Sequence, residues 1–241
     1  MLKFEIFARA LRVAPAMSPS RLTAFLLTAT LATASFAASG PKGVTLDTVI
    51  RKVAEKQKST RTLQADFRQE KTLGMLARPE VSSGTFLYSS PNSVLWTYDQ
   101  PKPVVMVIAN GWLTTYYPEL KKAEKVEVKR YEDRIFKYLG ASGAIDELGK
   151  YFNFRFVDAK SDPFLRLDLD PKTQAIARRV KHLTIWIDRQ SYLTTKFEYV
   201  EGDGDVTRYE FSNLRINSPV PAAKFTLQLP PSVKIEQMRL N

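Results

Sequence analysis

Seven aromatic side chains lie between residues 84 and 118, mostly in strand-like alternation, and this pattern constrains the fold more than any other feature of the chain. The alternating sets are Phe86 and Tyr88, then Val94, Trp96 and Tyr98, then Trp112, Thr114 and Tyr116. Successive side chains of a β-strand point to opposite sides, so each set occupies one face of its own strand. Large rings on successive antiparallel strands form either a thick core or a concave apolar wall, and the function depends on which of the two is present.

Turn signals separate these strands and others along the chain. Asn110-Gly111 lies between two apolar runs and is a strong signal for a two-residue hairpin. Further alternating segments extend from residues 62–72 to a terminal strand at residues 225–229. We therefore expect a mostly β fold with one antiparallel sheet of about ten or eleven strands. A sheet of that size must curl, close or be covered.

Three stretches have helical periodicity instead. Residues 45–58 carry apolar side chains at three- and four-residue spacing, which predicts an amphipathic helix. Residues 131–139 and 144–152 are predicted as two short helices, with apolar stripes that include Ile135, Phe136, Leu139, Ile145 and Leu148. These helices are too few to cover both faces of the sheet. The expected fold is an incomplete antiparallel β-barrel with a helical lid over a hydrophobic cavity.

The first 37 residues have the features of a secretory signal peptide. Residues 22–34 are apolar, Arg21 precedes them, and small residues allow cleavage after Ala37. Met17 is an alternative to Met1 as the start of translation. A buried N-terminal helix is the less favoured interpretation, because no amphipathic period is present. We expect residues 1–37 to be removed and the protein to reside in the periplasm.

Residues 38–241 are expected to form one half-barrel domain. The chain has no cysteine, so it lacks the residue that carries the lipid anchor of a bacterial lipoprotein, and we expect a soluble, monomeric protein after export. The formal net charge is +11, but lysines and arginines alternate with acidic residues. Nucleic acid is not an expected partner. The basic stretch at residues 121–130 is best interpreted as a solvated strand edge, with an acidic partner or an anionic membrane surface as the alternative.

Catalytic and metal sites have few candidate residues. The chain has one histidine, His182, which is expected on the solvent side of a strand. The Asp168–Asp170 and Asp203–Asp205 pairs lack the further ligands of a calcium loop, and turn chemistry explains them better. We predict no catalytic residue, no metal and no cofactor, and we do not expect an enzyme.

Binding of an acyl chain remains as the function best suited to the residues. A concave apolar sheet under a movable helical cover can hold such a chain in water, because each buried methylene contributes about 0.8 kcal/mol. The residues expected to line the cavity are Phe67, Phe86, Tyr88, Val94, Trp96, Tyr98, Trp112, Ile185 and Phe197.

Several sequence fragments, taken in their order along the chain, link this expected function to a known protein family. The fragments are LQADFRQ (63–69), GTFLY (84–88), SPN (90–92), LW (95–96), QP (100–101), NG (110–111), YP (117–118), AAKFT (222–226) and PPSV (230–233). Together they resemble the periplasmic outer-membrane lipoprotein carriers of the LolA type, over nearly all of residues 38–241.

The resemblance implies partners as well as a fold. It implies that the protein receives acylated lipoproteins from an inner-membrane ABC-type release complex and delivers them to an outer-membrane lipoprotein receptor. It places Val94 and Trp96 on the wall of the cavity and residues 131–152 at the position of the lid.

One position departs from the family pattern. Many members have an arginine before the proline of the SPN fragment, where it fixes the closed lid, and this chain has Ser90. A short hydroxyl cannot make the same contacts as a guanidinium. Either the lid is held differently, or the protein is a carrier of another amphiphile such as a glycolipid. A half-barrel sensor of lipoproteins is a separate alternative. An enzyme is the least supported alternative.

Overall fold

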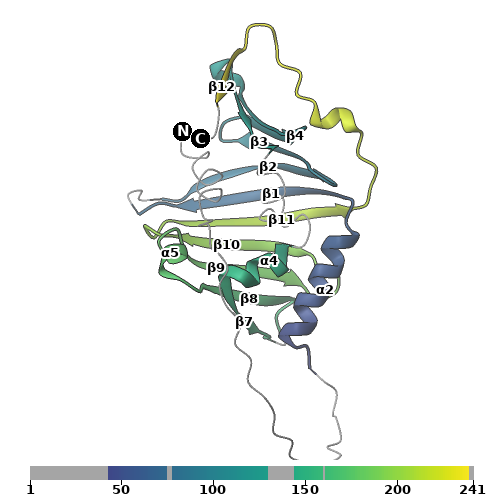
Figure 1. The fold of residues 1–241 in the computed structure, drawn as a ribbon, viewed down its shortest axis with the longest axis vertical. Helices are drawn as coiled ribbons and strands as arrows, with labels where there is room; N and C mark the ends of the chain where they lie inside the picture. The colour runs from purple at the N-terminus through teal and green to yellow at the C-terminus, as the bar shows by residue number, and fades with distance from the viewer. Residues whose placement is uncertain (1–42, 75–77, 130–143, 160, 239–241) are drawn as a thin grey trace, which may run out of the picture.

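A single curled sheet of twelve strands dominates the structure (Figure 1). The structure is a computed structural model that describes residues 43–74, 78–129, 144–159 and 161–238. The strands are β1 (Thr62–Thr72), β2 (Glu80–Ser89), β3 (Ser93–Gln100), β4 (Val104–Ala109), β5 (Trp112–Tyr117), β6 (Lys122–Glu127), β7 (Phe152–Val157), β8 (Phe164–Pro171), β9 (Val180–Asp188), β10 (Thr194–Glu201), β11 (Val206–Ile216) and β12 (Lys234–Met238).

The order of the strands leaves the sheet open. It runs β12-β6-β5-β4-β3-β2-β1-β11-β10-β9-β8-β7, so within the described ranges the end strands β12 and β7 each have one neighbour. Neighbouring strands are antiparallel except for β12 and β6, which run parallel. The sheet curls without closing, which confirms the incomplete barrel that the alternation predicts.

Two α-helices lie across one face of the sheet, which we call the inner face (Figure 1). Helix α2 (Leu46–Ser59) begins after Thr45, whose Oγ1 accepts the Thr48 N–H at 3.3 Å and so satisfies one free donor of the first turn. Helix α4 (Ala144–Tyr151) packs beside α2, and the Ile145 N–H donates to Gln57 Oε1 at 3.4 Å. Both confirm helices predicted from periodicity, although Phe152 opens β7 instead of ending α4.

Three single turns complete the described helices. They are α5 (Gln174–Ala177) and the 3-10 helices η1 (Pro118–Leu120) and η3 (Ala222–Phe225). The helix predicted at residues 131–139 lies outside the described residues. No helix in the ranges that the structure describes combines the length and the apolar character needed to cross a membrane.

The two helices bury one half of the inner face. This helix-covered cluster consists of Val49, Val53, Ala54, Ile145, Phe152, Leu165, Leu167, Leu169, Ile185 and Ile187. Leu167, Leu169 and Ile187 are fully buried. Burying a leucine or isoleucine side chain contributes about 1.5–3 kcal/mol, so these contacts fix both helices to β7, β8 and β9.

The other half of the inner face carries a second core, which we call the aromatic cluster. Its buried members are Phe67, Phe86, Tyr88, Val94, Tyr98, Val104, Ile108, Leu113, Val126, Val128 and Tyr209. Phe197 on β10 packs against both clusters, so the two cores are continuous at this ring.

The C-terminal segment differs from the expected strand at residues 225–229. Phe225 ends η3 and is buried, and the last strand, β12, begins only at Lys234. Prolines at 219, 221, 230 and 231 flank the alternating residues, and a proline cannot donate to a strand ladder. The predicted terminal strand is therefore wrong. Helix η3 contacts β3 and β4, where Val107 is buried on the outer face of the sheet, which indicates that this segment covers that face.

Candidate functional site

A layer of aromatic rings occupies the inner face where β10, β11, β1, β2 and β3 lie side by side. Phe86 and Trp96 meet edge to face with ring centroids 4.7 Å apart, and Phe67 and Tyr98 meet at 4.9 Å. Phe197 and Tyr209 are stacked at 4.8 Å. Edge-to-face and stacked pairs at these separations each add about 0.5–1.5 kcal/mol to the area that the rings bury.

Strand register explains why the rings meet. Phe86 lies directly opposite Ala65 on β1 and opposite Trp96 on β3, so the two rings share a face. Phe67 lies opposite Gly84, which has no side chain and leaves room for the ring above it. A Cβ on Gly84 would lie 1.8 Å from the carbonyl oxygen of Thr97. Glycine is therefore required at this close approach of two strands, where the β2–β3 register shifts.

The layer is partly core and partly surface. Phe67 and Tyr98 are 3% and 5% exposed, so they form its base. Other apolar residues packed against the cluster are only partly buried, namely Leu63, Trp96, Met106, Tyr117, Phe197, Tyr199 and Phe211. The alternation therefore specifies both a core and an apolar wall, and the half-buried residues are the ones that a bound molecule can reach.

Most of the residues expected to line a cavity lie together on this face. Those in or against the aromatic cluster are Phe67, Phe86, Tyr88, Val94, Trp96, Tyr98 and Phe197. Ile185 is a member of the helix-covered cluster and lies opposite Phe197 across the β9–β10 pair.

Trp112 is the exception. The hairpin at Asn110-Gly111 forms as expected, with φ angles of 53° and 80°, and it pairs Ala109 with Trp112. Leu113 therefore shares the face of Ile108 and the aromatic cluster, whereas Trp112 is on the outer face beneath Lys125, whose Nζ lies 5.2 Å from the ring centroid. The expectation that Trp112 lines the same cavity as Trp96 is wrong.

Three rings of this face are absent from the residues expected to line the cavity. Tyr209 and Phe211 of β11 pack on Phe197, Tyr209 also contacts Phe67, and Tyr199 of β10 belongs to the same face. The signal is present in the sequence, because Thr207, Tyr209 and Phe211 alternate in the same way as the residues of β2 and β3. Alternation alone does not reveal that β11 pairs with β1, and this pairing is what brings its rings to the cluster.

The residues expected in a lid fall into two groups. Ile145 and Leu148 of α4 pack in or against the helix-covered cluster, together with Ile185. Ile135, Phe136 and Leu139 lie outside the described residues.

Ser90, expected at the latch position, lies in the turn after β2. Its N–H donates to the Arg61 carbonyl at 2.7 Å. Burial raises the pKa of Tyr88, and a hydrogen bond with the Ser90 side chain opposes this rise. The serine hydroxyl is thus in contact with Tyr88 of the aromatic cluster, and its role in holding a lid stays a prediction.

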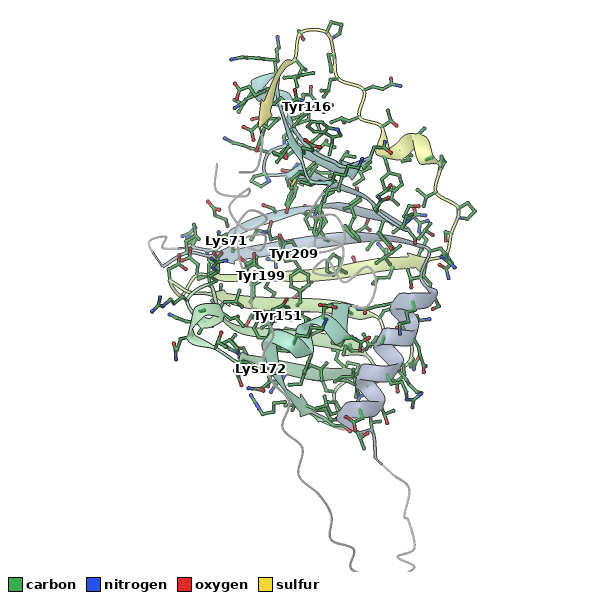
Figure 2. The ribbon with its side chains drawn as sticks, in the orientation of Figure 1. Lys71, Tyr116, Tyr151, Lys172, Tyr199 and Tyr209 are labelled. Carbon is green, nitrogen blue, oxygen red and sulfur yellow. The ribbon has the colours of Figure 1, made fainter. Side chains whose placement is uncertain are left out.

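Polar side chains gather at one end of the aromatic layer. Gln69, Lys71 and Thr207 follow Phe67 and Tyr209 along β1 and β11 on the same face. Lys71 Nζ forms an ion pair with Glu201 Oε1 at 3.5 Å, and the two side chains are only 13% and 10% exposed. Figure 2 shows Tyr209, Tyr199 and Lys71 in succession toward the left end of the sheet. The inner face is therefore apolar over most of its length and polar at this end.

The tyrosines between the two parts are neutral. Burial raises the pKa of Tyr209 well above its ordinary value, and burial likewise raises the pKa of Tyr199 and Tyr98. The hydroxyls of Tyr98 and Tyr209 lie 3.4 Å apart and form a hydrogen bond. These phenols can therefore donate as well as accept hydrogen bonds at neutral pH.

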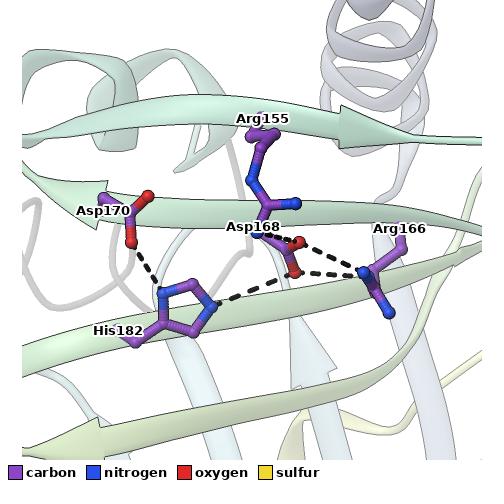
Figure 3. A network of polar contacts seen from close by, with 5 residues as sticks. All are labelled: Arg155, Arg166, Asp168, Asp170 and His182. Carbon is purple, nitrogen blue, oxygen red and sulfur yellow. Dashed lines mark hydrogen bonds and ion pairs between the residues drawn. The ribbon is translucent and has the colours of Figure 1, made fainter.

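A separate polar network lies on the outer face (Figure 3). Asp168 of β8 is 3% exposed and forms ion pairs with Arg155 Nη2 at 2.8 Å and Arg166 Nε at 3.3 Å. His182 Nδ1 lies 2.8 Å from Asp170 Oδ1. His182 is thus on the face opposite Ile185, as expected, but Asp168 and Asp170 belong to a strand, and turn chemistry is the wrong explanation for them.

The other pair of carboxylates, Asp203 and Asp205, does belong to a turn, as expected. Asp203 Oδ1 accepts the Asp205 N–H at 3.2 Å within the turn between β10 and β11. In the ranges that the structure describes, no group of three or more histidine, cysteine, aspartate or glutamate side chains is placed to hold a metal ion.

An open groove of about 390 Å³ lies between α2 and α4, away from the rings. Its lining is Asp47, Ile50, Arg51, Ala54, Glu55, Lys58 and Asp146. Five of these seven side chains are charged, which does not suit an acyl chain.

Comparison with known proteins agrees with this geometry. Residues 58–228 match a family model described as outer membrane lipoprotein carrier protein LolA. An outer-membrane lipoprotein carrier protein of Pseudomonas fluorescens strain Pf0-1 is 22% identical over 193 residues, which cover 79% of this chain and 89% of the relative. A protein of the same description from Pseudomonas paraeruginosa is 25% identical over 181 residues, covering 73% of this chain and 81% of the relative.

A solved structure shares the fold. The crystal structure of an uncharacterized conserved protein from Thermus thermophilus superimposes with a TM-score of 0.52 at 10% sequence identity. The match covers 78% of this chain and 97% of the other. At that identity the likeness concerns the arrangement of the strands alone.

Proposed function

Because this chain belongs to the LolA family of outer membrane lipoprotein carrier proteins, we propose that it shields the acyl chains of lipoproteins against its inner face. The observation that carries the proposal is the half-buried aromatic surface around Trp96, Phe197 and Phe211, which lies on the concave side of an open sheet. An acyl chain laid on this surface would remove both its own methylenes and these rings from water, at about 0.8 kcal/mol for each methylene.

The finer parts of the proposal come from the family and the sequence. The protein is exported to the periplasm after loss of residues 1–37 and acts there as a monomer. It accepts acylated lipoproteins from an inner-membrane ABC-type release complex and passes them to an outer-membrane receptor. The carrier role requires neither a cofactor nor a catalytic residue, and helix α4 would form part of the lid.

Bound material tests the proposal directly. The protein is purified from the periplasmic fraction without detergent, and the molecules that accompany it are extracted and identified by mass spectrometry. We expect peptides that carry an acylated N-terminal cysteine. Depletion of the protein in the native host should also leave lipoproteins in the inner membrane.

Two other outcomes would contradict the proposal in different ways. A preparation that contains a glycolipid or another amphiphile, with lipoproteins correctly sorted after depletion, would support the alternative carrier suggested by Ser90. A preparation without any amphiphile, together with normal sorting, would exclude the carrier role.

A further inference from the structure

At the polar end of the inner face, charged and amide side chains are buried to an unusual degree. Gln69 is 5% exposed and Thr207 is fully buried. Gln69 Oε1 and Trp96 Nε1 are both inaccessible to solvent and have no hydrogen-bond partner among the residues that the structure describes. Leaving a buried polar atom without a partner destabilises a fold, so each such atom calls for an explanation, such as an ordered water, an ion or a bound molecule.

The cation at this end is already paired. Burial is the main cause that raises the pKa of Glu201, and the carboxylates of Asp203 and Asp205 lie near enough to raise it further. Lys71 and Glu201 form an ion pair across β1 and β10, and both side chains are largely buried. A second cation or anion placed beside this pair would have to give up its hydration without a free counter-charge, which is costly. The surrounding groups are an amide, a threonine hydroxyl and neutral phenols, which offer both donors and acceptors.

The polar end is also continuous with the aromatic layer. Gln69 lies directly opposite Tyr209, and Lys71 lies directly opposite Thr207. Tyr209 in turn stacks on Phe197. Along β1 the ring layer is therefore followed by Gln69 and then by Lys71, and Figure 2 shows Tyr209, Tyr199 and Lys71 in succession in this direction.

We propose that Gln69, Tyr199, Thr207 and the Lys71–Glu201 pair bind the uncharged polar head of an acylated glycerol, so that the cargo lies in one orientation. The acyl chain lies on the rings around Trp96, and the ester carbonyl and hydroxyl groups point toward Lys71. The site selects a neutral glyceride over an anionic lipid of the same chain length. This inference rests on the proposed carrier function and adds the class of head group and its position.

The test compares two lipids with one palmitoyl chain each. Monopalmitoylglycerol is the neutral probe and palmitoyl lysophosphatidate is the anionic one, and both are titrated calorimetrically into the delipidated protein below their critical micelle concentrations. The wild-type protein should bind monopalmitoylglycerol at least about tenfold more tightly, because the phosphate would lose hydration beside a lysine that is already paired and near further carboxylates.

Glu201→Gln should reverse this preference. The substitution leaves the positive charge of Lys71 without its partner, so the affinity for lysophosphatidate should rise by about tenfold or more relative to the glyceride. Glu198→Gln is the matched control. Glu198 is on the same strand and is also ion-paired, with Arg208 Nε at 2.8 Å, but it is on the outer face. The control should leave both affinities unchanged.

Gln69→Leu provides a second measurement in case Glu201→Gln fails to fold, which urea unfolding would reveal. It should weaken monopalmitoylglycerol binding about tenfold by removing the amide. Gln64→Leu, on the outer face of the same strand, is its control. If the wild-type protein binds both lipids equally and the folded variants change neither affinity, the head-group site is wrong while the carrier function stands. If the wild-type protein binds neither lipid, this inference fails, and the copurified material and the sorting of lipoproteins decide the carrier function.

Discussion

Two tryptophans with similar sequence surroundings lie on opposite sides of this molecule. Trp96 packs edge to face on Phe86 and Phe67 at the inner face, whereas Trp112 lies on the outer face near Lys125. At the scale of single residues they therefore form a natural pair for testing the site. Any effect that depends on position within the sheet should appear at Trp96 and be absent at Trp112.

Trp96→Glu should abolish the binding of acylated cargo while the strand content stays unchanged. A carboxylate placed among the rings would have to be desolvated whenever an acyl chain covers it, and an unpaired buried charge is costly. Binding is measured with a palmitoylated lipopeptide, and strand content by circular dichroism. Trp112→Glu is the control and should bind normally. Normal binding by Trp96→Glu would place the cargo site elsewhere.

Asp188 gives a prediction about stability and pH. Its Oδ1 accepts the Ser191 N–H at 2.8 Å, the Ser191 hydroxyl at 2.8 Å and the Gln190 N–H at 3.2 Å, and so fixes the turn between β9 and β10. The backbone hydrogen bond from Ser191 is the largest cause that lowers the pKa of Asp188. A carboxyl whose pKa is lower in the folded state stabilises the fold above its unfolded-state pKa, about 4, and loses this contribution as the pH falls further.

Asp188→Ala should therefore destabilise the protein by about 1 kcal/mol at pH 7 and by less at pH 3. Urea unfolding of the wild type and the variant at both pH values measures the difference. An equal difference at pH 7 and pH 3 would mean that the ionised carboxylate is not what stabilises this turn.

At the scale of elements, the close approach of β2 and β3 at Gly84 controls the aromatic layer. The strands shift register between Ser83 and Gly84, and this brings the Thr97 carbonyl to the place where a side chain would begin. The shift also brings Tyr98 opposite Gly84, and Phe67 of β1 packs on the Tyr98 ring. The glycine is thus part of the reason that three strands can share one ring cluster.

Gly84→Ala should destabilise the fold by about 3 kcal/mol, because the added Cβ would meet a backbone oxygen that only a shift of β3 could relieve. Gly74→Ala is the matched control, since a Cβ there has no atom within 4 Å. The control should change stability by less than about 0.5 kcal/mol. Chemical denaturation of both variants measures the effect, and equal stabilities would show that the strands adjust without cost.

Element type was more predictable from the sequence than element faces. Residues 62–72 match β1 in full, because their alternation is uninterrupted. The face of Trp112 was not predictable by strand alternation alone. A one-residue change in register exchanges the two faces of a strand, and the Gln100–Pro103 connection does not fix the register of β3 on β4. Because Ala109 pairs with Trp112, the faces on which the residues of β4 lie determine the faces on which the residues of β5 lie.

The position of the last strand depends on contacts that are far apart in the sequence. β12 pairs in parallel with β6, and a chain of alternating residues contains no information about so distant a partner. The polar end of the inner face could not be predicted from the sequence either. Gln69, Lys71, Glu201 and Thr207 come from three strands that only the folded sheet brings together.

At the scale of the whole molecule, the two clusters divide the inner face into a half that the helices cover and a half that the rings form. α2 and α4 close the first half, and Phe197 joins it to the second. The open edges at β7 and β12 leave the sheet free of the constraint of a closed barrel. Cargo on the aromatic half should therefore contribute stability that the helices do not already supply.

Removal of bound lipid should lower the melting temperature. A ligand at a hundred times its dissociation constant stabilises the folded state by about 2.7 kcal/mol, which corresponds to roughly 5–10 °C for a chain of this size. The protein is delipidated by reversible unfolding in guanidinium chloride, and its thermal unfolding is followed before and after the lipid is added back. Trp96→Glu should show no such increase. A wild-type melting temperature that does not depend on lipid concentration would contradict cargo binding to the folded state.

The placement of the three tryptophans has an optical consequence. Trp112 and Trp186 are both on the outer face, with the Nζ of Lys125 and of Lys196 at 5.2 Å and 4.8 Å from their ring centroids. Trp96 alone of the three is on the inner face. Loading with an acyl chain would change the emission of Trp96 and leave the emission of the other two as a constant background. The intrinsic tryptophan fluorescence of the unlabelled protein would therefore report the fraction of the protein that carries an acyl chain.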